Sequence, residues 1–235
     1  MIKVLDKGYV HLVDVMGSDL SVVNSARVSF NKASKELEHK DHQLIRYLAN
    51  HGHTSPFRHA MVQLEVYAPL MVARQWWKYI VGSSHQEGSQ DPFTAWNESS
   101  RRYVTEDIEF YIPTEDAWRS SPENSKQGSG NPVGIPLGKE ATQRLLAQIE
   151  YGMQNYDWAV ENNIATEMAR LFNPSAYGLY VRWYWTASLQ SVGHFLNQRL
   201  DNHAQVEIQE YAKATKLLIE PHFPVSLPQL LKQAE

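Results

Sequence analysis

The sequence predicts an α+β fold, a mixed sheet packed by helices, and three observations support this prediction. Segments with alternating apolar residues, which are typical of strands, lie among segments with helical spacing. They do not follow the regular strand–helix alternation of a parallel α/β fold. The 235 residues, 43% of them hydrophobic, suffice for a substantial core, and no internal repeat divides them. We therefore expect a single domain over residues 1–235.

The first half of the chain contains two predicted strands and three predicted helices. Alternation predicts strands over residues 9–15 and 61–68, and helical spacing predicts helices over residues 19–29, 41–50 and 70–77. The helix over 41–50 ends at His51-Gly52, because glycine can adopt the left-handed conformation that closes a helix. In the helix over 70–77, Trp76 and Trp77 are expected in the core, since burial is the commoner use of tryptophan.

The second half has longer helices. Strands are predicted over residues 106–112 and 177–186, and helices over 139–163, 165–172 and 189–219. Residues 120–138 are rich in Ser, Pro, Gly and Asn, which predicts a surface loop.

Composition narrows the classes of function. A formal net charge of −4 provides no basic field for nucleic acid, so a small anion is the expected partner. The absence of cysteine excludes disulfides, thiolate zinc sites and a cysteine nucleophile. No apolar run reaches the length of a signal peptide core or a membrane span, so we expect a cytoplasmic protein without a membrane partner.

The segment 96–103 concentrates polar groups between a predicted helix and a predicted strand. Ser100, Arg101 and Arg102 can donate hydrogen bonds to phosphate oxygens, and Glu98 can accept one from a sugar hydroxyl or a ring N–H. Such a loop can hold an anion. A solvated turn whose charges pair with one another is the alternative.

A polar stripe follows the predicted helix over 189–219, with Arg199 beside it. Its members recur at steps of three and four residues: Ser191, His194, Gln198, Asn202 and Gln205. Few carboxylates lie among them, unlike on an ordinary solvated face, so the stripe is consistent with a wet binding cleft. An exposed amphipathic face is the alternative.

Five histidines crowd one region of the chain: His39, His42, His51, His53 and His59. Their spacing fits no His-Glu-x-x-His helix, and there is no cysteine to join them, so we expect no metal site. Capping or hydrogen-bonded core roles are favoured. A competing hypothesis is a histidine-dependent metal hydrolase that acts on nucleotides. Separately, residues 51–59 can form a ligand-binding loop after the helix end.

Read together, these segments resemble the flavin-dependent thymidylate synthase family over almost the whole chain. The matching blocks occur in one order: Leu12-Val-Asp-Val-Met-Gly with Ala26-Arg-Val-Ser-Phe, His51-Gly-His-Thr-Ser-Pro-Phe, Ala73-Arg-Gln-Trp-Trp, Asn97-Glu-Ser-Ser-Arg-Arg-Tyr, Glu167-Met-Ala-Arg and Asn197-Gln-Arg-Leu-Asp-Asn-His-Ala-Gln. The family fold is therefore expected.

One motif departs from the family pattern. Lys78-Tyr79-Ile80 stands in the place of Arg-His-Arg, and an insertion over residues 81–95 lengthens the path to Asn97-Glu98. Neither Tyr nor Ile can carry a cation, and Lys78 lacks the bidentate fork of arginine.

The resemblance implies which positions bind the two ligands. The dUMP-binding positions map onto Gln75, Lys78, Glu98, Ser100, Arg101, Arg102, Arg170 and Arg199. The FAD-binding positions map onto His53, Ser55, Lys78, Tyr79, Ile80, Glu98, Ser188 and His194. Ser188 and His194 stand where the family often has asparagine, and both can form hydrogen bonds.

The resemblance implies reductive methylation of dUMP to dTMP, with methylenetetrahydrofolate as carbon donor and NADPH as reductant through FAD. A chain without cysteine agrees with a route that needs no cysteine nucleophile. Arg199 is expected to stabilise negative charge on the uracil ring, and Ser100 to bind dUMP. Family members are homotetramers, which is expected here too. A flavin- or nucleotide-binding relative without synthase activity is the alternative.

Overall fold

The computed structural model describes residues 1–81, 94–99, 108–123, 128–173 and 176–231. A five-stranded sheet of order β1-β2-β3-β5-β4 lies at its centre. The strands are β1 Ile2–Val4, β2 Gly8–Met16, β3 Met61–Pro69, β4 Ala95–Glu98 and β5 Tyr180–Ser188. All the pairings among these strands are antiparallel, so the α+β class is confirmed but the prediction of a mixed sheet is wrong.

The antiparallel arrangement follows from where the helical connections return to the sheet. Met16 at the end of β2 pairs with Met61 at the start of β3, and Pro69 at the end of β3 pairs with Tyr180 at the start of β5. The chain therefore returns to the end of the sheet that it left, both from β2 to β3 and, counted across β4, from β3 to β5. From β3 to β4 it crosses to the other end, because Ala95 at the start of β4 pairs with Thr186 near the end of β5. Strands β3 and β4 thus run parallel, but β5 lies between them, so every neighbouring pair is antiparallel.

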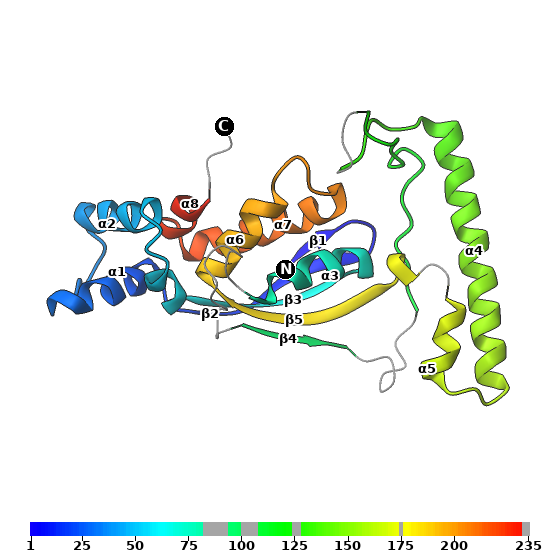
Figure 1. The fold of residues 1–235 in the computed structure, drawn as a ribbon, viewed down its shortest axis with the longest axis horizontal. Coiled ribbons are helices and arrows are strands. Elements are labelled where there is room, and N and C mark those ends of the chain that lie inside the picture. The colour runs from blue at the N-terminus through cyan, green and yellow to red at the C-terminus, as the bar shows by residue number, and fades with distance from the viewer. Residues whose placement is uncertain (82–93, 100–107, 124–127, 174–175, 232–235) are drawn as a thin grey trace.

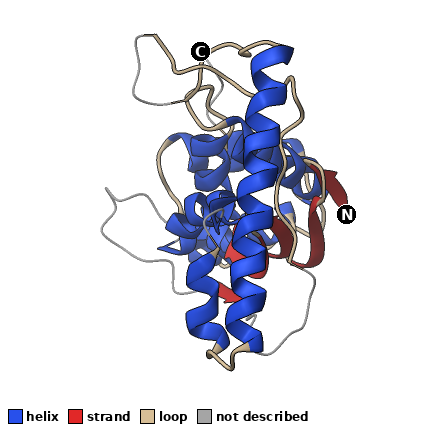
Figure 2. Cartoon of the chain, turned by 90° about the vertical axis from the view of Figure 1, so that its right-hand side faces the viewer, coloured by secondary structure: helices blue, strands red, loops and turns tan. Residues whose placement is uncertain are grey.

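Helices cover one face of the sheet and extend beyond both of its ends. The α-helices are α1 Asp19–Arg27, α2 His39–Asn50, α3 Leu70–Trp76, α4 Ile135–Glu161, α5 Thr166–Ala169, α6 Leu189–Arg199, α7 Val206–Ile219 and α8 Ser226–Leu230. Figure 1 shows α3, α6 and α7 above the sheet, α1, α2 and α8 at one end, and α4 with α5 at the other. Figure 2 shows α5 running beside the lower part of the long helix α4.

The core lies between the sheet and its helices. Alternate side chains of β3, such as Val62, Leu64 and Val66, are buried, as the period of two predicted. Trp76 of α3 is fully buried and stacks on Phe195 of α6 with ring centroids 4.3 Å apart. Trp77 is 49% exposed, so its predicted place in the core is wrong. Trp77 begins the 3-10 helix η3 (Trp77–Val81), and as the neighbour of the inward-facing Trp76 it points to another side of the helix.

The predicted helix over residues 189–219 is interrupted between α6 and α7. The backbone N–H of His203 donates to the Asp201 carboxylate at 2.7 Å, and the N–H of Ala204 donates to the Asp201 carbonyl at 3.0 Å. This local side-chain to backbone bonding competes with the helical ladder and turns the chain.

Two predictions about the segments around residue 100 are corrected. Residues 96–98, expected in a loop, belong to the edge strand β4, in which Trp96 stacks on Trp183 with centroids 4.8 Å apart. Of the predicted strand over 106–112, residues 108–112 contain only an isolated bridge between Phe110 and Leu179, and the first two residues lie outside the described part. The neighbouring residues Ala176–Gly178 form a 3-10 turn, which offers no ladder to extend.

Candidate functional site

Helix α6 and its N-cap contain five of the residues singled out in the sequence: Ser188, Ser191, His194, Gln198 and Arg199. Ser188 is its N-cap, and the Ser188 hydroxyl accepts a hydrogen bond from the backbone N–H of Ser191 at 3.2 Å. Both serine side chains are fully buried. His194 lies in the middle of the helix and Arg199 at its last turn. The cap is of the kind that satisfies an otherwise unpaired N–H at a helix start.

A polar cavity of about 620 Å³ opens at the C-terminal end of α6. The residues that line it are Gln75, Gly128, Asn197, Gln198, Arg199, Asp201, His203, Ala204 and Gln205. The structure thus brings together Gln75 and Arg199, which are 124 residues apart in the sequence. Two members of the polar stripe, Gln198 and Gln205, line the same cavity. The buried Ser191 does not line the cavity, nor do His194 and Asn202.

Gln75 connects α3 to the turn that precedes α7. Its side-chain amide donates to the Gln205 side-chain oxygen at 2.6 Å and to the Met71 carbonyl at 3.2 Å. Because Gln75 is held from both sides, its position at the wall of the cavity is defined before any ligand arrives.

Arg199 lies over the ring of Tyr79, with its guanidinium carbon 5.1 Å from the ring centroid. The Arg199 Nε atom is buried and has no hydrogen-bond partner among the described residues. Tyr79 is 8% exposed, and its ring also contacts His194, with centroids 5.4 Å apart. Burial raises the pKa of the Tyr79 hydroxyl, and the charge of Arg199 opposes this effect only in part, so the phenol stays neutral.

Three other predicted site residues, Lys78, Ile80 and Glu98, lie in η3 and β4. Lys78 is exposed in η3, and the backbone of Ile80 lies in the same turn, whereas the side chain of Ile80 is outside what the structure describes. Glu98 ends the edge strand β4. Desolvation raises the pKa of the Glu98 carboxyl. A hydrogen bond from Trp96 and the charge of Arg74 lower it, but they do not outweigh the desolvation.

The histidine-rich segment forms an aromatic surface after α2. Tyr47 stacks on His51 with centroids 4.1 Å apart, and His53 lies 5.9 Å from the same ring. Gly52 adopts φ +68°, as expected for the residue that closes a helix. His53 is exposed, and the exposed Ser55 begins the 3-10 helix η2 (Ser55–His59).

Arg170 lies apart from the polar cavity. It begins the 3-10 helix η4 (Arg170–Phe172) after α5, and its Nε donates to the Glu167 carbonyl at 3.1 Å. Figure 1 shows α5 at the end of the molecule beyond the sheet, whereas α6 lies over the sheet. Ser100, Arg101 and Arg102 lie outside the described residues.

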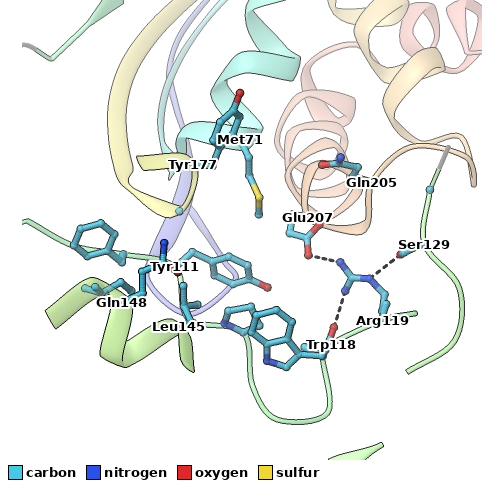
Figure 3. A pocket seen from close by; sticks show the side chains of 16 residues that line it. Met71, Tyr111, Trp118, Arg119, Ser129, Leu145, Gln148, Tyr177, Gln205 and Glu207 are labelled. Carbon is cyan, nitrogen blue, oxygen red and sulfur yellow. Dashed lines mark hydrogen bonds and ion pairs between the residues drawn. The ribbon is translucent and has the colours of Figure 1, made fainter. Parts of the chain in front are cut away.

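Sequence reasoning missed a second cavity of about 460 Å³, in which aromatic and aliphatic side chains predominate. Figure 3 shows Met71, Tyr111 and Trp118 around it, with Arg119 and Glu207 at its edge. The Arg119 guanidinium pairs with the Glu207 carboxylate and donates to the Ser129 hydroxyl at 2.8 Å.

The charged and titratable side chains at this second cavity act mainly on one another. Burial and the charge of Glu207 raise the pKa of Tyr111 to about 12, while Arg119 opposes the shift. The one feature of the sequence that could have indicated this cavity is the Trp118-Arg119 pair, which precedes a Ser- and Pro-rich loop. Its partner Glu207, 88 positions away, could not be read from that pattern.

Two properties of the described residues bear on the alternatives of a metal site and a membrane partner. No group of three or more His, Cys, Asp or Glu side chains in the described part of the chain is arranged to hold a metal ion. None of the described helices is long and apolar enough to cross a membrane.

Comparison with known proteins identifies close similarities over nearly the whole chain. Residues 11–225 match the family described as thymidylate synthase complementing protein. The chain is 39% identical to the flavin-dependent thymidylate synthase of Thermotoga neapolitana over 233 residues, 99% of this chain and 95% of the relative. It is 38% identical to that of Thermosipho africanus over 232 residues, 99% of this chain and 94% of the relative.

The fold also has counterparts among solved structures. The UMP/dUMP methylase PolB from Streptomyces cacaoi, bound with 5-Br dUMP, superposes with a TM-score of 0.79 at 26% identity, covering 97% of this chain and 96% of PolB. PolB bound with 5-Br UMP superposes with the same TM-score.

Proposed function

Because the chain belongs to the flavin-dependent thymidylate synthase family, we propose that it converts dUMP to dTMP with methylenetetrahydrofolate as carbon donor and NADPH as reductant through bound FAD. The observation that carries this proposal is the meeting of Gln75 and Arg199 on one polar cavity. Its volume of about 620 Å³ falls within the usual range for small-molecule sites, roughly 300–1,000 Å³.

In this proposal dUMP is bound by cationic, amide and hydroxyl donors together with one carboxylate. The residues assigned to it are Gln75, Lys78, Glu98, Ser100, Arg101, Arg102, Arg170 and Arg199. Arg199 contributes planar N–H donors that can face a uracil ring, and negative charge that grows on the ring during activation is stabilised by a donor already held in place. The cavity walls also supply amide groups, which suit the carbonyl and N–H edge of a pyrimidine.

The residues around α6 fit a flavin. The side-chain oxygen of Gln190, in the first turn of α6, is buried without a hydrogen-bond partner among the described residues, as expected beside a ligand N–H or hydroxyl. FAD is assigned to His53, Ser55, Lys78, Tyr79, Ile80, Glu98, Ser188 and His194. Bound flavin supplies the reduction that side chains cannot perform. The Ser188 hydroxyl already caps α6, so its contribution is to position the helix start.

We further propose that the active site is completed by a second copy of the chain in a homotetramer. Arg170 follows α5, which lies at one end of the molecule, whereas Arg199 ends α6 over the sheet (Figure 1). A dUMP molecule that contacts both arginines needs one of them from another protomer. The apolar side chains of Tyr151, Trp158 and Leu171 on α4 and η4 are 54–74% exposed, which suits burial in an assembly.

The test combines binding with turnover. We expect purified protein, titrated with FAD, to show the flavin absorbance bands and to oxidise NADPH in a dUMP-dependent manner. With methylenetetrahydrofolate present, dTMP should form. FAD binding without dTMP formation would favour the alternative of a nucleotide-binding flavoprotein, and no FAD binding at high micromolar concentration, with or without dUMP, would contradict the proposal.

A further inference from the structure

Arg199 is held differently from an arginine fixed by an ion pair. Its guanidinium carbon lies 5.1 Å from the Tyr79 ring centroid, and it forms no salt bridge with a carboxylate in the described part of the chain. Its Nε atom is buried without a hydrogen-bond partner there. The cation is therefore partly desolvated, and the aromatic ring is the contact that orients it.

Tyr79 is rigid enough for this task. Its ring meets Phe195 edge to face, with centroids 5.4 Å apart and an interplanar angle of 79°. Phe195 in turn stacks on the fully buried Trp76 at 4.3 Å. Phe195 and Arg199 are four residues apart on α6, so they lie on the same side of the helix and Tyr79 contacts both. The position of the Tyr79 ring is thus set by the core.

An aromatic contact has a chemical consequence that an ion pair lacks. A carboxylate partner takes two guanidinium N–H groups and cancels the charge. A ring under the flat guanidinium leaves the in-plane N–H donors available for a ligand and leaves the charge uncancelled. Arg199 also lines the polar cavity, where those donors are needed.

We propose that Tyr79 is a positioning residue, whose buried ring holds the Arg199 guanidinium toward the polar cavity in the orientation that dUMP activation requires. This inference rests on the proposed function. It also replaces the assignment of Tyr79 to FAD, which rested only on the position of this residue in the altered Arg-His-Arg motif: here Tyr79 supports the arginine of α6.

The test compares Tyr79→Phe, which keeps the ring, with Tyr79→Leu, which removes it. Single-turnover dTMP formation, dUMP affinity and flavin content are measured for each. We expect Tyr79→Phe to stay within about twofold of the wild type, and Tyr79→Leu to lose roughly tenfold in single-turnover rate, as loss of a desolvated cation–π contact implies. The change in dUMP affinity should be smaller, because the charge of Arg199 remains.

Phe223→Leu is the matched control, since Phe223 is a fully buried phenylalanine of the core whose ring has no aromatic contact with Tyr79 or Phe195 in the described part of the chain. It should lower stability and leave the single-turnover rate unchanged. A flavin content that falls in parallel with turnover in Tyr79→Leu would assign Tyr79 to the flavin and overturn the proposal. So would an equal loss in Phe223→Leu.

Crystal structures of the two Tyr79 variants separate this inference from the proposed function, because they require no turnover. Arg199 should keep its place above the ring in Tyr79→Phe and turn away in Tyr79→Leu. An Arg199 that stays in place in Tyr79→Leu overturns the inference even if the enzyme is active. A wild-type protein that forms no dTMP contradicts the proposed function, and with it the catalytic part of the inference, whatever the crystals show.

Discussion

Asp19 is the residue whose removal should most clearly test how the fold supports the candidate site. Its side chain is 2% exposed, and its two carboxylate oxygens accept hydrogen bonds from the backbone N–H groups of Val225 and Ser226, each at 2.8 Å. These amides lie at the start of α8, and the side chain of Asn197 on α6 donates to the Leu230 carbonyl at the end of α8 at 2.8 Å. Asp19 therefore supports, through α8, the helix that carries Arg199.

The expected magnitude follows from these two bonds. Losing one hydrogen bond to a charged group costs about 1.5–3 kcal/mol. The two bonds share one carboxylate and are not additive, so we expect Asp19→Ala to lower the free energy of unfolding by about 3 kcal/mol. For a domain of this size that corresponds to a decrease in Tm of roughly 6–12 °C.

The assay is thermal and urea unfolding at one fixed protomer concentration, because the stability of an oligomer depends on concentration. Hydrogen exchange at the Val225 and Ser226 amides reports the same loss locally. Asp14→Ala is the control, since Asp14 is exposed and its bond goes to the adjacent Val15 N–H at 2.8 Å. A Tm of Asp19→Ala within about 2 °C of the control, or unchanged exchange at the two amides, would refute the reasoning.

Three further predictions address the site, the packing of α4 and the pH dependence of stability. Arg199→Lys should lower the single-turnover rate of dTMP formation by about 10²–10³ with a smaller effect on dUMP binding, because lysine keeps the charge and loses the planar fork; a wild-type rate with weakened binding would reduce Arg199 to a binding role. Gly138→Ala should destabilise the protein by roughly 1–3 kcal/mol in urea unfolding, because its Cβ would stand 1.8 Å from the Glu115 carbonyl oxygen, whereas the exposed Lys139→Ala should have little effect. Burial raises the pKa of Glu65, but hydrogen bonds from Tyr9 and Tyr184 and the charge of Arg182 outweigh it and hold the pKa below the ordinary value of 4.5. The wild type should therefore be more stable than Glu65→Gln above the ordinary glutamate pKa and lose this advantage as pH falls through the lowered pKa; a difference independent of pH in urea unfolding would contradict this.

The family and most elements could be predicted from local patterns. Alternation of apolar residues located β2 and β3 to within one residue of their observed ends, and helical spacing located α2 and most of α4, because burial of one face imposes a period on the sequence. The break between α6 and α7 was missed, because the bonds of Asp201 to its own neighbours compete with a helix that the apolar spacing alone favours. The edge strand β4 was missed because its pairing with β5 depends on a partner more than eighty residues away.

For the candidate site, the residue types and their spacing indicated the chemistry, because a family motif records which functional groups a reaction needs. Which of those groups meet depends on sheet register and helix packing, and these are set between distant segments. The amide of Gln75 reaches Gln205 across 130 positions, Arg119 pairs with Glu207 across 88, and the ring of Tyr79 reaches Arg199 through the packing of η3 against α6. No local periodicity encodes such meetings, since each one depends on how distant elements pack. The Tyr79–Arg199 contact, for example, depends on the buried cluster of Trp76 and Phe195, which holds the Tyr79 ring.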